Sequence, residues 1–175
     1  MRGRRLRIMF VDEARFGRMN RIRPCWAPVG KRPDVAAQLI REYIYLYGAV
    51  SPKDGTCVYL IMPTSNTACF QAFLDVVARR FARQDILLVL DGAPNHRCSD
   101  LVVPGNVTLL YLPPYSPELN PKENLWDEIR EKIFKNYALK SMAVRAKLKQ
   151  AILYIERNRG LVRSITSFPY IINSL

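Results

Sequence analysis

Two short apolar segments, each ending in an aspartate, constrain the fold of this chain more than any other feature. The first is "LRIMFVD" (residues 6–12), and the second is "DILLVLD" (residues 85–91). Both are short runs of large apolar side chains, which favours buried strands over helices. Residues 67–83 lie between them, with apolar side chains at helical spacing and Asn66 or Thr67 as the expected helix cap. A helical crossover would let the two strands lie side by side and parallel in one sheet.

The other segments predict a mixed sheet flanked by helices. Residues 43–50 and 56–62 are typical of two strands joined by a tight turn, and residues 107–112 of a further strand. Residues 21–35 are interrupted by proline and glycine, which predicts a short strand within a long basic loop. Helices are expected over 121–136 and 141–158. We therefore expect an α/β fold in which an antiparallel meander leads into strands parallel to the first.

Length and composition indicate one domain. The chain has 175 residues, of which 49% are hydrophobic, enough for one well-packed core, so we expect a single domain over residues 1–175. No run approaches the roughly 18 apolar residues that a membrane span needs, and the first apolar stretch is too short for a signal peptide. The four cysteines form no C-x-x-C pair, which argues against a zinc site or a disulfide framework. We expect a cytoplasmic, nucleoid-associated protein.

The charge of the chain is concentrated at its two ends. Residues 1–41 contain 11 Lys or Arg against three Asp or Glu, a net charge of +8. Residues 42–120 have a net charge of −2, and residues 121–163 of +6. Most charged runs are simply solvated, but clustered arginine in a chain with a pI near 9.9 favours a polyanionic partner, above all nucleic acid. An anionic membrane surface fits less well, because no basic helix has a Trp/Phe/Leu face.

The paired aspartates suggest a metal site. If the two strands are adjacent and parallel, Asp12 and Asp91 lie at one edge of the sheet. Two carboxylates so close resist ionising together unless a cation neutralises them, and an all-oxygen site favours Mg²⁺ or Mn²⁺ over zinc. For one aspartate taken alone, a cap of the following turn is the better interpretation; the pair after two buried strands favours the metal site.

Glu123 has two interpretations. Asn120 suits a helix cap, Pro121 the first helical position, and Glu123 the third, so the four residues match a variant capping box. Beyond them, Leu125, Trp126 and further apolar residues would bind the first turn to the sheet. From that turn the Glu123 carboxylate could also lean over the strand ends as a third metal ligand.

Three motifs resemble a known family. "FVDEARFG", "LVLDGAPNH" and "LPPYSPELNPKENLW" are similar to the three acidic motifs of DDE transposases, specifically the Tc/mariner superfamily and its bacterial insertion-sequence branch. The resemblance spans about residues 6–158, and the third motif is the most specific part. Thirty-one residues separate Asp91 from Glu123, a little fewer than is usual in that group. Gly92 stands where members of the family often have asparagine.

The resemblance implies an RNase H-like, retroviral integrase-like fold and a metal-dependent endonuclease. Asp12, Asp91 and Glu123 would be the catalytic residues and would hold two Mg²⁺ ions, for which Mn²⁺ could substitute, with Asp12 bridging both. Two metals about 4 Å apart can activate the attacking oxygen and stabilise the leaving one. The reaction implied is cleavage of DNA at transposon ends and transfer of the freed 3′-hydroxyl to target DNA, by a homodimer on DNA.

Further residues are expected to support the site or contact DNA: His96, Asn95, Arg18, Arg21, Arg23 and Lys122. His96 is the only histidine and could meet a phosphate, although a plain turn or capping role is open. No helix-turn-helix region fits before Leu6, so we expect a separately encoded recognition protein, or a remnant of a decayed element. Two other readings stay open: a structure-selective RNase H-like nuclease, and a catalytically silent DNA-binding remnant.

Overall fold

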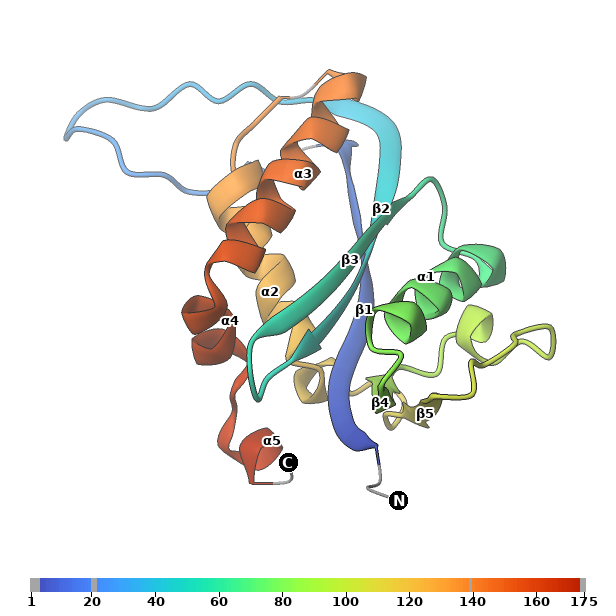
Figure 1. The fold of residues 1–175 in the computed structure, drawn as a ribbon. Helices are drawn as coiled ribbons and strands as arrows, with labels where there is room; N and C mark the ends of the chain where they lie inside the picture. The colour runs from blue at the N-terminus through green and yellow to red at the C-terminus, as the bar shows by residue number, and fades with distance from the viewer. Residues whose placement is uncertain (1–3, 20–21, 139, 174–175) are drawn as a thin grey trace.

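A mixed five-stranded sheet forms the centre of the protein (Figure 1). The computed structural model describes residues 4–19, 22–138 and 140–173. The strands are β1 (Arg5–Met19), β2 (Leu39–Ser51), β3 (Thr56–Met62), β4 (Gln84–Leu90) and β5 (Val107–Tyr111), in the order β3-β2-β1-β4-β5. β1 pairs antiparallel with β2 and parallel with β4. The expected α/β fold, with a hairpin followed by parallel strands, is confirmed.

Helices cover both faces of the sheet. They are α1 (Thr67–Arg80), α2 (Lys122–Ile129), α3 (Ser141–Arg157), α4 (Arg159–Thr166) and α5 (Pro169–Ile172). Successive side chains of a strand point to opposite faces, so β1 divides its apolar residues between two cores. Met9 and Val11 pack with α1, whereas Phe10 and Ala14 pack with α2 and α3.

The crossover helix α1 has the predicted cap. The Asn66 side chain accepts a hydrogen bond from the Cys69 amide at 2.9 Å. Phe70, Phe73 and the other apolar residues of its inner face are buried against the sheet. Because α1 occupies the connection between β3 and β4, it brings β4 back beside β1 in the same direction.

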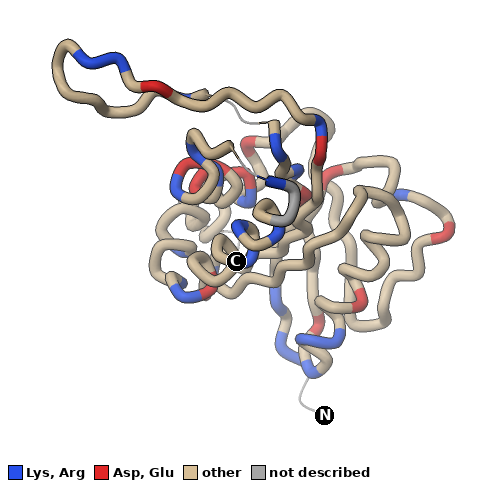
Figure 2. Tube along the Cα trace, turned by 90° about the horizontal axis from the view of Figure 1, so that it is seen from above, with Lys and Arg blue, Asp and Glu red and all other residues tan. Residues whose placement is uncertain are grey.

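The connection between β1 and β2 differs from the prediction. Residues 22–38 form no strand; they are an extended arm that projects from the body (Figures 1 and 2). Three prolines in this segment donate no backbone hydrogen bond. Trp26 is 102% exposed and Val29 is 104% exposed, so the arm has no apolar face packed on the body. The missing partner strand and the prolines together explain the extended loop.

The C-terminal third also differs in detail. α2 begins at Lys122 and ends at Ile129, and a π-helical turn over Arg130–Phe134 takes the place of the last part of the predicted helix. Asn136 then adopts φ = 56°, which ends the segment. α4 and α5 were not predicted, because helices of eight and four residues give too short a periodic pattern.

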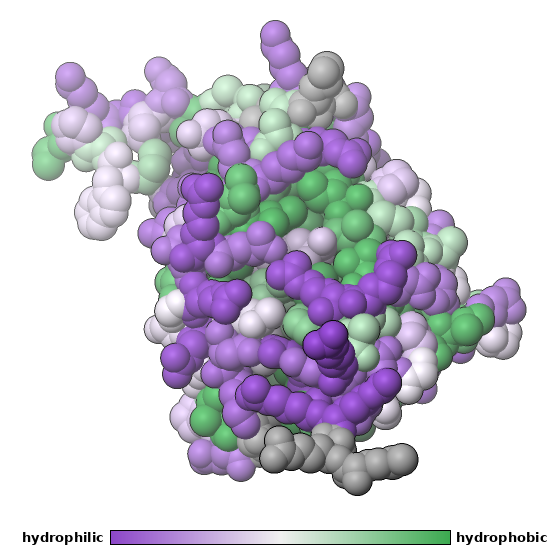
Figure 3. All heavy atoms as spheres, viewed as in Figure 1, coloured by the Kyte–Doolittle hydropathy of each residue, from purple (hydrophilic) through white to green (hydrophobic). Residues whose placement is uncertain are grey.

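Much of the view in Figure 3 is hydrophilic around a central apolar area beside α3. None of the helices in the described ranges is long and apolar enough to span a membrane.

Candidate active site

Asp12 lies within β1, where that strand separates from β4. The β1–β4 pairing runs as far as Phe10 with Val89, while β1 continues beside β2 up to Met19. We expected Asp12 to end its strand, and this was wrong, because β1 continues to Met19. Asp12 nevertheless lies two residues beyond Phe10, the β1 member of the last β1–β4 pair. Asp91 likewise lies two residues beyond Val89, the β4 member of that pair. β1 and β4 are adjacent and parallel, as predicted, so the backbones of Asp12 and Asp91 lie at the same edge of the sheet.

The carboxyl group of Asp12 is held by the side chain of Trp126. The indole Nε1–H donates to Oδ2 at 2.7 Å. Burial raises the pKa of Asp12 to about 7, and the negative charge of Glu123 adds to this rise. The two carboxylates thus oppose each other's ionisation, and a bound cation would relieve this repulsion.

Asn120 attaches the start of α2 to β1. Its side-chain Nδ2–H donates to the Val11 carbonyl at 2.9 Å, and its Oδ1 accepts from the Lys122 amide at 3.1 Å. The predicted reciprocal capping box is not formed, because the Asn120 amide donates to the Pro117 carbonyl instead. The Glu123 carboxylate is therefore not used to cap its own helix, and it lies near enough to Asp12 to raise the pKa of that group.

Asp91 follows β4 and is bound to His96. The histidine is 1% exposed and lies in a short 3₁₀ turn, η1 (Pro94–His96). Its Nδ1 lies 2.8 Å from Asp91 Oδ1, and its Nε2 lies 2.8 Å from Glu13 Oε1. Burial favours the neutral imidazole, but hydrogen bonds to the two carboxylates raise the pKa of His96 to about 10. Both ring nitrogens therefore donate at neutral pH, and the bond to His96 lowers the pKa of Asp91.

Glu13 was not singled out from the sequence. It follows Asp12, so its side chain points to the opposite face of β1, where it meets His96. The adjacent acidic residues Asp12 and Glu13 were the available signal. Only the position of η1 reveals that Glu13 belongs with Asp91 rather than with Asp12.

A cavity of about 470 Å³ opens beside these residues. Asp12, Glu13 and Glu123 contribute to its wall, together with Trp126 and Arg23. The cavity brings two of the three predicted catalytic carboxylates into one space, with basic side chains on its rim.

The DDE superfamily endonuclease family model matches residues 7–144. The chain belongs to this family. It is 40% identical over 101 residues to the uncharacterized protein y4pE/y4sA of Sinorhizobium fredii (strain NBRC 101917 / NGR234), a match covering 54% of this chain and 75% of that protein. It is also 26% identical over 160 residues to the Tc3 transposase of Caenorhabditis elegans, covering 84% of this chain and 47% of the transposase. The predicted Tc/mariner resemblance is thereby confirmed.

Solved structures of Mos1 transposase share the fold of this chain. A pre-cleavage Mos1 transpososome matches with a TM-score of 0.64 at 16% identity, over 92% of this chain and 54% of that one. A Mos1 mariner paired-end complex with Mn matches with a TM-score of 0.63 at 17% identity, over the same shares of the two chains. The expected RNase H-like fold is confirmed. The chain spans about half the length of the Tc3 and Mos1 transposases.

The carboxylates of this chain suit a hard divalent cation. Carboxylate oxygens are the ligands that Mg²⁺ and Mn²⁺ prefer, and burial together with the charge of Glu123 raises the pKa of Asp12, a cost that a bound cation would offset. In the described ranges, no three Asp, Glu, His or Cys side chains are gathered closely enough to enclose an ion. Asp91 has one carboxylate oxygen, Oδ1, bound to His96 and to the Ala93 amide.

The other predicted site residues have separate surroundings. Arg18 pairs with Glu42 at 3.0 Å, and Arg23 pairs with Glu131 at 3.3 Å on the rim of the cavity. Arg21 lies outside the described residues. Asn95 precedes His96, and its Nδ2 is buried without a hydrogen-bond partner among the described residues. Lys122 is also fully buried, so it cannot reach DNA directly.

Proposed function

We propose that residues 1–175 form one catalytic unit of a DDE transposase that cuts DNA at transposon ends and joins the freed 3′ end to target DNA. The observation that carries the proposal is the placement of Asp12, Asp91 and Glu123. Asp12 and Asp91 lie level, each two residues beyond the last β1–β4 pair, and Glu123 in the first turn of α2 lines the same cavity as Asp12. The names of the Tc3 and Mos1 relatives support the reaction class.

The three carboxylates would hold two Mg²⁺ ions, or Mn²⁺ in their place, with Asp12 shared between them. The bound ions would activate the attacking oxygen and stabilise the leaving oxygen. The chain's own contribution is orientation. Trp126 holds Asp12, His96 holds Asp91, and Asn120 fixes the turn that carries Glu123. The Mos1 complexes with Mn and Mg support the choice of metal.

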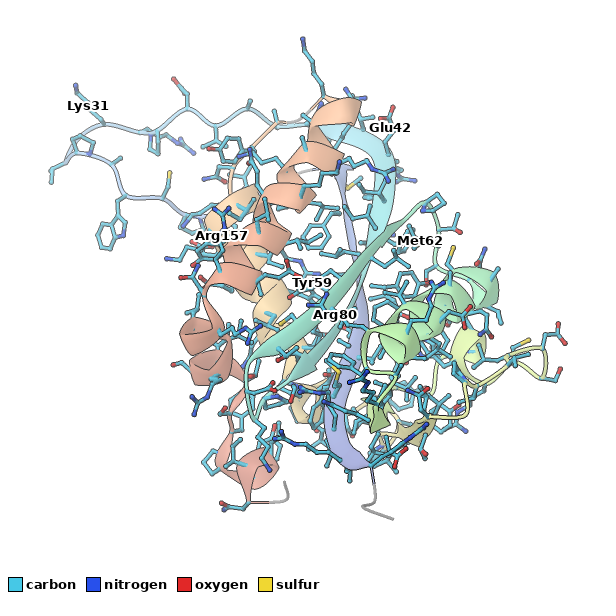
Figure 4. The ribbon with its side chains drawn as sticks, in the orientation of Figure 1. Lys31, Glu42, Tyr59, Met62, Arg80 and Arg157 are labelled. Atoms are coloured by element: carbon cyan, nitrogen blue, oxygen red, sulfur yellow. The ribbon has the colours of Figure 1, made fainter. Side chains whose placement is uncertain are left out.

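The partner of this site would be DNA. The chain has a net charge of +12, and the exposed arm contributes Lys31 and Arg32 (Figures 2 and 4). Such charges give salt-sensitive contact with phosphates that does not depend on sequence. We infer that the protein acts as a homodimer, as the paired-end complexes of Mos1 suggest.

The test is nicking and joining of a plasmid that carries the genomic DNA flanking both sides of the coding region, with any protein encoded directly upstream supplied. We expect cleavage that requires Mg²⁺ or Mn²⁺ and is lost in Asp12→Asn and in Asp91→Asn. Equal cleavage by the parent and both variants would overturn the proposal. Nicking of branched DNA without joining would indicate a structure-selective nuclease, and metal-independent binding without cleavage would indicate a silent DNA-binding remnant.

A further inference from the structure

Lys122 occupies a closed aromatic slot beside the active site. Its side chain is fully buried, and its ammonium nitrogen has no hydrogen-bond acceptor among the described residues. The nitrogen lies 4.0 Å from the centre of the Tyr59 ring and 4.2 Å from that of Trp126. Tyr59 belongs to β3 (Figure 4), and its ring packs with the core under α2 and α3. Two ring faces therefore replace the water that the ammonium loses on folding.

Gly48 makes room for this slot. It is the residue of β2 that pairs with Asp12 of β1. A Cβ atom at position 48 would lie 2.5 Å from Cε of Lys122 and 2.8 Å from Cη2 of Trp126. The backbone of β2 thus forms the floor on which both side chains lie, directly across the strand pair from the catalytic aspartate.

Trp126 connects the slot to Asp12. Lys122 and Trp126 are four residues apart on α2, which places their side chains on the same face of the helix. The face of the indole meets the ammonium, while its edge donates the 2.7 Å hydrogen bond to Asp12 Oδ2. A cation over the ring face attracts the π electrons and makes the indole N–H a stronger donor.

We propose that Lys122 is a positioning residue for Asp12: its ammonium fixes the Trp126 indole over Gly48, so that the indole N–H holds one oxygen of the Asp12 carboxylate. The proposal rests on the proposed function, because it takes Asp12 as a catalytic carboxylate. The contacts of Lys122 with Trp126, and of Trp126 with Asp12, do not depend on that function. One oxygen of Asp12, Oδ2, is thereby fixed.

Packing alone does not explain a lysine here. Methionine has an unbranched stem of similar length and would fill the same slot without the cost of removing a charge from water. Replacing a buried charge by a well-packed apolar side chain is often neutral or stabilising. A lysine retained for packing alone would therefore be replaceable by methionine with no change in the indole or in the chemistry.

The test is the Trp126 indole N–H signal in ¹⁵N-labelled protein without metal. The chain has two tryptophans, so Trp26→Phe assigns the signal of Trp126. We expect Lys122→Met to remain folded, to move the Trp126 N–H proton upfield and to speed its exchange with water. The matched control is Tyr59→Phe, which keeps the ring of the slot and should leave the signal in place. An unchanged Trp126 signal in folded Lys122→Met would overturn the proposal.

DNA cleavage gives a second, independent readout. Weakening one hydrogen bond to a charged group should lower cleavage per folded molecule about tenfold in Lys122→Met. In a Trp126→Phe background, which lacks the indole N–H, the same substitution should have no further effect on cleavage; a full additional loss of cleavage there would contradict the proposal.

If Lys122→Met does not fold, Tyr59→Leu removes one ring of the slot, and an unmoved indole signal in that variant would overturn the proposal instead. A parent protein that cleaves no DNA would defeat the proposed function, while the indole signal would still decide the role of Lys122.

Discussion

Asn120 donates its side-chain amide to the carbonyl of Val11 at 2.9 Å, which joins the start of α2 to the residue before Asp12. The bond connects positions 109 residues apart in the sequence, and both groups are buried. It sets the height of the first turn of α2 over the sheet, and so the place of Glu123 relative to Asp12.

Asn120→Ala should therefore do more than remove a helix cap. It leaves the Val11 carbonyl and the Lys122 amide without partners, and we expect the free energy of unfolding to fall by about 1–3 kcal/mol. Cleavage should fall as well, because the hydrogen bond that holds the first turn of α2, and with it Glu123, against β1 is lost. Urea unfolding and cleavage per folded molecule measure the two effects. A loss under about 0.5 kcal/mol with normal cleavage would show that the bond is not needed.

Glu123→Gln tests whether Glu123 is a metal ligand or only a structural residue. The Glu123 carboxylate raises the pKa of Asp12, so removing its charge relieves repulsion, and the metal-free variant should be as stable as the parent or more so. It should lose the rise in melting temperature that Mg²⁺ gives the parent, and cleavage should fall more than about a hundredfold. The control is Glu118→Gln, an exposed residue of the same motif. If Glu118→Gln and not Glu123→Gln removes the metal response, the third carboxylate is misassigned.

The pH dependence of stability should reveal the charged His96. Histidine has a pKa of about 6.5 in an unfolded chain, and the folded chain raises the pKa of His96 to about 10. Its contribution is therefore complete below pH 6.5 and is lost as the pH rises toward 10. We expect the difference in unfolding free energy between the parent and His96→Gln to shrink steadily between pH 6.5 and 8.5. Lys122, whose pKa is lowered to about 8, acts with the opposite sign but is present in both proteins and cancels. A difference that stays constant across this range would mean that His96 is neutral in the fold.

DNA binding should depend on the charges of the exposed arm. Lys31→Glu combined with Arg32→Glu should weaken binding to DNA of any sequence and make its salt dependence less steep by about one unit of slope per lost phosphate contact. Charge reversal of Arg18 and Arg23 should act in the same direction, although it also breaks their pairs with Glu42 and Glu131. The control is Arg80→Glu at the end of α1, on the opposite face of the sheet. Titration of a labelled duplex at several salt concentrations measures the affinity and its salt dependence. Equal salt slopes for the arm variants and the control variant would show that the arm does not contact DNA.

The sequence by itself located the five strands of the sheet and α1 to α3 in the right order, and it singled out three acidic positions as candidates. Apolar runs of β-type residues located β3, β4 and β5 to within a residue, and the helical spacing with Asn66 located α1, because burial and capping leave a local periodic pattern. The parallel arrangement of β1 and β4 followed from the crossover helix between them. Asp12, Asp91 and Glu123 became candidates because each lies in a short motif that can be recognised without knowledge of distant contacts.

Only the tertiary structure decided how the candidates are supported. Glu13 meets His96 across 83 positions, and Trp126 meets Asp12 across 114, and no local pattern encodes such distances. Lys122 reads as a solvated charge at the start of a helix, and its burial depends on a glycine of another strand, Gly48. The short strand expected within residues 21–35 does not form in the described part of that segment, because a strand needs a neighbouring strand and the sequence alone does not show whether one is available. Local periodicity records which face of an element is buried, whereas the contacts that orient the carboxylates form only when distant elements pack together.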